Sequence, residues 1–294
     1  MRLSLPDFGT PVQRSTPLRF PFLPHVPGGT SLHPDPTSAF PPRPSAYWAG
    51  PRHLAGDDQR LYDVVADTLA GLGWTTLTIV RGRQELDDDA EHGHLLRSTV
   101  LHISPDGLRW AQWCLADQPF LLGDAPIAWQ FSARSEREGS ADWSAYVTSG
   151  LPGEALAAFV TALDARDQPG AGHKDPEAVL DAVTSHGWRR DSAHHGAADP
   201  ACASYIEYCD VPPFIQDGDP RTLSTEPDDV GPLGWQAWCD PSARLPYLWA
   251  ASFSTSAPDD LVAVFADAIS STQPVLRHSL PESTRSHLLL APAD

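Results

Sequence analysis

The sequence WSAYVTSGLPGEALAAFVTAL, residues 143–163, returns at residues 249–269 as WAASFSTSAPDDLVAVFADAI. The two stretches align without a gap at one offset of 106 residues. Three pairs of anchors keep that offset: Trp143/Trp249, Pro152/Pro258 and Phe159/Phe265. A repeat of this length, with large apolar residues at fixed places, indicates a duplicated domain.

Each copy predicts a strand, a turn and a helix. Trp143, Ala145 and Val147 alternate with polar residues, which is the period of two of a half-buried strand. Apolar residues then recur at helical spacing from residue 156 to 163 and again from 261 to 269. Ser256 is the expected N-cap of the second of these helices, with Pro258 in its first turn.

The segments before these stretches also match between the copies. We expect one helix capped by Asp57 or Asp58 and another capped by Asp175, each ending near a Gly-Trp pair. Strands are expected at 75–80, 98–103 and 109–114, with the turn Ser-Pro-Asp-Gly at 104–107. Residues 234–239, GWQAWC, are taken as the twin of RWAQWC at 109–114, which leaves 127–131 as an extra strand of the first copy.

The predicted fold class is α+β. It is a tandem repeat in which each copy is a small antiparallel sheet with flanking helices, and the two copies are related by a pseudo-two-fold axis. The predicted division is a Pro-rich extended arm at 1–46, a first repeat at 47–168, a second and divergent repeat at 169–272, and a tail at 273–294. The arm contains eleven prolines, which oppose both helix and central strand.

Composition restricts the function. The net charge is −18, with 38 acidic against 20 basic residues, which disfavours general binding to nucleic acid. The four cysteines form no Cys-x-x-Cys pair, as expected for buried reduced thiols in a cytoplasmic protein. We find neither a membrane-spanning apolar run nor a signal peptide, so we expect a cytoplasmic location and no membrane partner.

These features together resemble the SPDY domain family. The resemblance rests on the Ser-Pro-Asp-Gly turn between two strands, the preceding helix that ends in Gly-Trp, and the aromatic strand that leads to a Pro-x-x-Leu-x-x-x-Phe helix. Pro51-Arg-His-Leu-Ala-Gly56 is similar to the family's opening segment. The resemblance implies an actinobacterial domain, found mainly in Streptomyces and often in tandem, with no activity to carry over. The second copy lacks the Ser-Pro-Asp turn, since Tyr208-Cys-Asp-Val-Pro-Pro213 stands in its place.

Aromatic residues on the strands are the best candidates for a functional site. In residues 109–115, Trp110 and Trp113 fall on opposite faces, and Trp235 and Trp238 repeat this split. One face serves the core of the repeat. The other face either packs sheet to sheet against the second repeat or forms a surface that binds a protein or peptide partner. The candidate binding residues are Arg109, Trp110, Gln112, Tyr146 and Trp235.

Two other functions remain open. Single-stranded or terminal DNA binding predicts that arginines gather on one face, and the candidates are Arg81, Arg83, Arg97, Arg109 and Arg134. A metal-dependent hydrolase predicts a cation site in the acidic loop at Asp88, His92 and His94, with Asp106 as a further titratable group. His194, His195, Cys202 and Cys209 are zinc-type ligands, but their spacing matches no known site. The sequence contains no phosphate-binding loop, no His-Glu-x-x-His and no dinucleotide fingerprint, so no cofactor is expected.

Overall fold

The computed structural model describes residues 45–79, 97–116, 121–122, 125–191, 194–209, 233–241 and 247–293. The Pro-rich arm, apart from its last two residues, lies outside this range. So do the acidic loop with Asp88, His92 and His94, and the insertion at 210–232. The α-helices in the described ranges are α1 (Leu61–Gly71), α2 (Gly153–Asp164), α3 (Pro176–Ser185) and α4 (Asp259–Ser270).

The strands form one large antiparallel sheet and one small sheet. The large sheet runs in the order β2-β3-β4-β6-β7-β12-β11-β10-β9-β8, and β5 pairs with β6. Its strands in the first half are β2 (Thr75–Ile79), β3 (Arg97–Ile103), β4 (Arg109–Ala116), β5 (Leu121–Leu122), β6 (Ala125–Ala133) and β7 (Trp143–Thr148). Those in the second half are β8 (Arg189–Asp191), β9 (Gly196–Ala198), β10 (Ser204–Cys209), β11 (Gly234–Cys239) and β12 (Trp249–Phe253). The α+β class is therefore confirmed.

The expectation of a separate small sheet in each repeat is wrong. The two halves join edge to edge, because β7 pairs with β12 and the sheet continues through 11 strands. The alternative of sheet-to-sheet packing is also wrong for the same reason. At the junction Tyr146 faces Ser252, the residue 106 positions later, and the neighbouring pairs are Ala145 with Phe253 and Val147 with Ala251.

The predicted equivalence of residues 109–114 and 234–239 in the two halves is also wrong. On β7, Val147 faces Trp129 of β6, and on β12 the corresponding Phe253 faces Trp235 of β11. The twin of β11 is therefore β6, again 106 residues earlier, and residues 127–131 are not an extra strand. The similar sequences RWAQWC at 109–114 and GWQAWC at 234–239 therefore suggest the wrong pair of equivalent strands. By register, β4 corresponds to β10.

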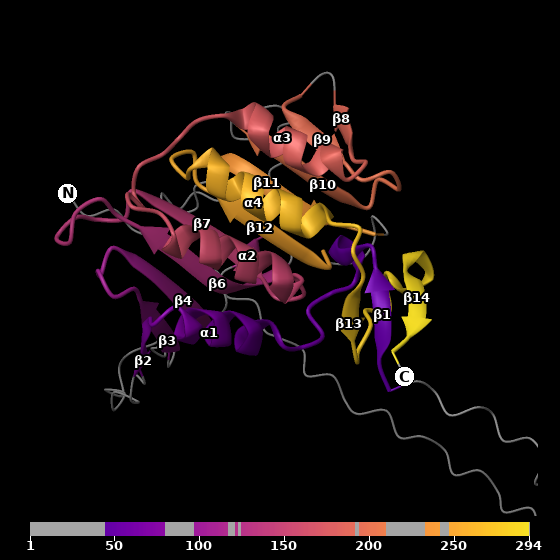
Figure 1. The fold of residues 1–294 in the computed structure, drawn as a ribbon, viewed down its shortest axis with the longest axis horizontal. Helices are drawn as coiled ribbons and strands as arrows, with labels where there is room; N and C mark the ends of the chain where they lie inside the picture. Colours follow the sequence, from indigo (N-terminus) through magenta and orange to yellow (C-terminus); the bar gives the residue numbers. More distant parts are fainter. Residues whose placement is uncertain are drawn as a thin grey trace, which may run out of the picture. The chain divides into compact units, whose positions relative to one another are not determined.

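The four helices lie side by side on one face of the large sheet, in the order α1, α2, α4, α3 (Figure 1). Between helices and sheet lies a core of aromatic rings. Phe253 of β12 contacts both Phe159 of α2 and Phe265 of α4, with ring centroids 5.7 and 5.1 Å apart. Because all three rings are buried, the halves share one core rather than having two.

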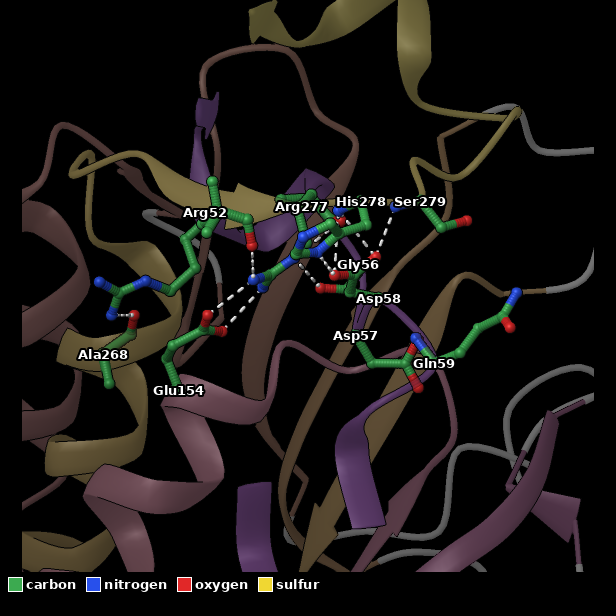
Figure 2. A network of polar contacts seen from close by, with 12 residues as sticks. Arg52, Gly56, Asp57, Asp58, Gln59, Glu154, Ala268, Arg277, His278 and Ser279 are labelled. Carbon is green, nitrogen blue, oxygen red and sulfur yellow. Dashed lines mark hydrogen bonds and ion pairs between the residues drawn. The ribbon is translucent and has the colours of Figure 1, made fainter. Parts of the chain in front are cut away.

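A small sheet at the edge of the molecule holds the tail. Its central strand β1 (Tyr47–Gly50) pairs with β13 (Val275–Arg277) and with β14 (Leu289–Pro292). Figure 2 shows the polar contacts that fix it: Arg277 donates two hydrogen bonds, of 2.6 and 2.7 Å, to Glu154 at the start of α2. Asp58 accepts from the backbone of His278 and Ser279. The tail is thus an integral part of the fold.

Candidate macromolecule-binding face

The strand face opposite the helices carries no helix in the described part of the chain, and we call it the open face (Figure 1). Strand alternation assigns residues to it. On β7, Trp143, Ala145 and Val147 are buried towards the helices, so Ser144 and Tyr146 point to the open face. The same alternation on the neighbouring strands places Trp110, Gln112, Gln130, Tyr205, Glu207, Gln236 and Trp238 there.

Side chains with hydrogen-bonding groups cross the open face at one level. Successive register partners across six strands are Gln112, Gln130, Tyr146, Ser252, Gln236 and Glu207, which we call the polar row. At ordinary strand spacing this row is about 24 Å long. Within it, Gln236 is only 7% exposed and its Nε2 has no hydrogen-bond partner among the described residues. A buried amide donor without an acceptor is uncommon in proteins, and a bound ligand that supplies an acceptor would satisfy it.

Two aromatic groups lie on opposite sides of the polar row. Trp110 is on the side of Ser132 and Ser144, and the Arg134 guanidinium lies over its ring, 5.4 Å from the centroid. Two hydrogen bonds from Arg134 to the oxygen of Gly107, of 2.9 and 3.3 Å, hold the guanidinium in place. Trp110 is therefore a partly exposed ring on a rigid support.

The second aromatic group is a stacked pair on the other side of the row. The rings of Tyr205 and Trp238 are 5.4 Å apart and inclined by 19°. Tyr205 donates from its hydroxyl to the oxygen of Cys202, at 2.8 Å. Because both rings are partly exposed and packed on each other, they form a flat apolar platform at low cost in side-chain entropy.

Two of the predicted binding residues are not on this face. Trp235 is fully buried under the helices, where its indole Nε1 donates to Asp259 at 2.9 Å. The error came from the wrong twin strand, and Trp238 is the residue of this pair that reaches the open face. The expected alternation could not choose between them, since a tryptophan stands on each face of β11. Gln130, Gln236 and Tyr205 were missed as well.

Arg109 is buried on the helix side and acts as a structural residue. Its Nε donates to the oxygen of Leu163 at the end of α2, at 2.9 Å, and its other nitrogens bond Asp106 and the oxygen of Arg166. Arg109 thereby ties β4 to the end of α2 and to the residue Arg166 just beyond it. Among the described residues, Arg109 and Arg134 lie on opposite faces of the sheet, so they do not form the basic patch that DNA binding predicts.

The contacts of Asp106 are those of a residue that stabilises the turn at 104–107. Burial opposes ionisation of this carboxyl group, but hydrogen bonds from Ser104 Oγ, the Leu108 N–H and Arg109 outweigh it and hold the pKa of Asp106 below its usual range. Gly107 has φ of +72°, which a side chain would strain. Within the described ranges, no three His, Cys, Asp or Glu side chains gather as metal ligands, and the acidic loop with His92 and His94 is outside those ranges.

No disulfide links the four cysteines, all of which lie in the described ranges. Only Cys239 is buried, where burial raises the pKa of its thiol to about 12, while Cys202 is exposed. The expectation that the thiols are buried is correct for Cys239 and wrong for the other three. None of the described helices is long and apolar enough to cross a membrane.

Together these features define a class of protein: an α+β protein with helices on one face of an antiparallel sheet and an aromatic, amide-bearing face opposite. A comparison with known protein families finds a match in two segments of the chain. Residues 103–170 and 217–275 match the SPDY family, which is described as a domain of unknown function (DUF317). This match confirms the predicted resemblance. It falls in two separate segments, which is consistent with tandem copies of the domain. Pro51–Gly56, the expected opening segment, precedes the first matched segment.

The first matched segment starts at the end of β3 and contains the Ser-Pro-Asp-Gly turn, β4, β6, β7 and α2. The second contains β11, β12 and α4. Both segments therefore include the junction strands and the helix that follows each. No match to the chain was found among curated proteins or among solved structures.

Proposed function

We propose that the protein is a non-catalytic binding module, and that the open face holds a protein or peptide partner. The observation that carries the proposal is the polar row, which contains the unpartnered amide of Gln236 and has aromatic rings on both sides. Aromatic residues are enriched at protein interfaces, and a buried amide gains most from a partner that supplies its missing acceptor.

The dimensions favour an extended segment as the partner. A row of about 24 Å accommodates about seven residues of extended chain. Backbone carbonyls of such a segment are the acceptors that the glutamine amides need, and apolar side chains at its two ends reach Trp110 and the Tyr205–Trp238 pair. The net charge of −18 favours a partner that is not itself acidic. We place this interaction in the cytoplasm.

We also propose that the two halves are copies of one unit, related by a pseudo-two-fold axis through the junction. Three features support it: each half has the order helix, strands, helix; equivalent residues Tyr146 and Ser252 face each other; and the edge contact of Trp113 with Trp129 is matched by that of Tyr208 with Trp235, at 5.2 and 5.4 Å. The aromatic groups on the open face are then related by the same axis.

The test is quantitative capture from the native host with the whole chain as bait. Trp110→Ala combined with Trp238→Ala removes both aromatic groups, and Trp48→Ala, at a 45% exposed tryptophan of the small sheet, is the matched control. We expect proteins that bind the wild type and the control but are lost from the double variant. A nuclease-treated sample separates a protein partner from a nucleic acid. If the double variant captures the same proteins as the wild type, the open face is not the binding site.

The captured partner then gives a direct measurement. Loss of more than about 1 kcal/mol at each of the two aromatic positions weakens binding by about 30-fold or more in Kd for the double variant. Gln236→Ala removes the unpartnered amide and should weaken binding of the captured partner.

A further inference from the structure

The two outer strands of the large sheet differ in how they meet solvent. Among the strands that the structure describes, β2 and β8 are the ends of the sheet, and they correspond to each other in the two halves. An edge strand presents unpaired backbone N–H and C=O groups, and natural proteins commonly protect it with charges or by keeping it short. Only one of these two strands is protected in this way.

Strand β8 is short and charged. It consists of Arg189, Arg190 and Asp191, and Arg190 forms ion pairs with Glu177 and Asp181 of α3. A second strand approaching this edge would meet charged side chains on each face. Strand β8 is thus closed to further pairing.

Strand β2 is open. Its sequence, Thr-Thr-Leu-Thr-Ile, has no charge, no proline and no glycine, and its β-branched residues favour strand pairing. All five residues are exposed, including Leu77 at 47% and Ile79 at 41%. These two side chains point to the open face, while Thr76 points to the helix side, where it contacts His102 at 3.0 Å. Among the described strands, β2 pairs with β3 alone.

The pattern of β2 is complementary to itself. If two copies pair antiparallel about Leu77, Leu77 faces Leu77 and Thr75 faces Ile79 on the open face, while Thr76 faces Thr78 on the other face. A chain with a net charge of −18 repels its own copies, and β2 itself adds no charge to this repulsion. The chain already joins its own halves by antiparallel pairing, at β7 and β12.

We propose that β2 is a self-association edge, at which a second copy of this chain pairs antiparallel about Leu77 and continues the sheet across the dimer. Standard-sized protein interfaces bury about 1,200–2,000 Å², and a pair of five-residue strands buries less. We therefore expect a weak dimer, with a Kd on the order of micromolar. The symmetric pairing closes on itself, and the charged β8 edges at the far ends prevent the sheet from growing into a fibre.

Sedimentation equilibrium of the full chain over a range of concentrations tests this proposal. The wild type should pass from monomer to dimer. Leu77→Lys and Leu77→Glu should each remain monomeric, because like charges then face each other at the self-paired position. Mixing the two variants should restore a dimer, since opposite charges now meet. Leu276→Lys, at a 40% exposed leucine of β13, is the control and should dimerise like the wild type.

Each other outcome overturns the proposal. A wild type that stays monomeric excludes the edge, a Leu77→Lys variant that dimerises places association elsewhere, and a mixture that stays monomeric excludes the register about Leu77. Hydrogen exchange needs no variant: in the wild type, the amides of residues 75–79 should become more protected as the concentration rises. Unchanged exchange there would also contradict the proposal. The result is independent of the partner-binding test, which uses Trp110 and Trp238.

Discussion

At the scale of single residues, Trp235 and Trp238 show how position on a strand decides the role of a side chain. They are three residues apart on β11 and therefore lie on opposite faces of the sheet. Trp235 is buried with its Nε1 bonded to Asp259, and Trp238 is a partly exposed ring stacked on Tyr205. The first stabilises the fold, and the second is available to a partner.

This difference predicts unequal costs of removing the indole N–H. Trp235→Phe leaves the fully buried Asp259 carboxylate without one of its donors, and should lower the free energy of unfolding by about 1–3 kcal/mol. Trp238→Phe keeps the stacked ring and should change it by no more than about 0.5 kcal/mol. Urea denaturation followed by circular dichroism measures both. Equal losses would show that the two faces are not distinct.

At the scale of elements, helix starts show where local sequence is a sufficient guide and where it is not. Asp175 caps α3 as predicted, accepting a hydrogen bond from the N–H of Ala178 at 3.3 Å. The predicted caps Asp58 and Ser256 are wrong. Asp58 instead binds the backbone of His278 and Ser279, and Ser256 donates to the oxygen of Asp142. These partners come from distant parts of the chain, which no local pattern reveals.

The cap at Asp175 can be measured. Asp175→Ala should destabilise the protein by about 1 kcal/mol, because the first turn of α3 loses its side-chain acceptor. Asp67→Ala, at an exposed position in the middle of α1, is the control and should cost no more than about 0.5 kcal/mol. Thermal unfolding of the two variants side by side gives the comparison. A loss at Asp175 no larger than at Asp67 would contradict the assigned cap.

The contact between the tail and α2 predicts a dependence on pH. Burial opposes ionisation of Glu154, but the hydrogen bonds and the charge of Arg277 outweigh it and lower the pKa of this carboxyl group. A carboxyl group with a lowered pKa in the folded state stabilises the protein above its unfolded pKa of about 4.3, and this contribution is lost as pH falls further.

Glu154→Gln removes this titration. The variant should be less stable than the wild type at pH 7, and its stability should fall less between about pH 5 and pH 3, because the affected group no longer gains a proton. Urea midpoints across this range provide the measurement. Parallel curves for the two proteins would show that Arg277 does not hold Glu154 ionised.

At the scale of the whole molecule, the sequence predicted the content of the fold better than its assembly. The alternation at 143–148 and the spacing at 153–164 correctly gave the buried faces of β7 and α2, since burial leaves a periodic trace in the side chains. Backbone N–H and C=O groups, which every residue except proline carries, join β7 to β12. The pattern of side chains in the sequence therefore could not predict this junction. Trp238 was not predicted for a different reason: a tryptophan stands on each face of β11, and alternation alone cannot say which face is buried.

The most direct test of the account is a cross-link across that junction. In a background of Cys114→Ser, Cys202→Ser and Cys209→Ser, Tyr146→Cys with Ser252→Cys places two thiols on directly facing residues, about 4.5–5.5 Å apart at Cα, within disulfide range. Tyr146→Cys with Ala250→Cys is the diagonal control, at about 7–8 Å. We predict an intramolecular disulfide in the first variant and none in the second. Equal cross-linking in both, or none in either, would contradict the joining of two like halves at Tyr146 and Ser252.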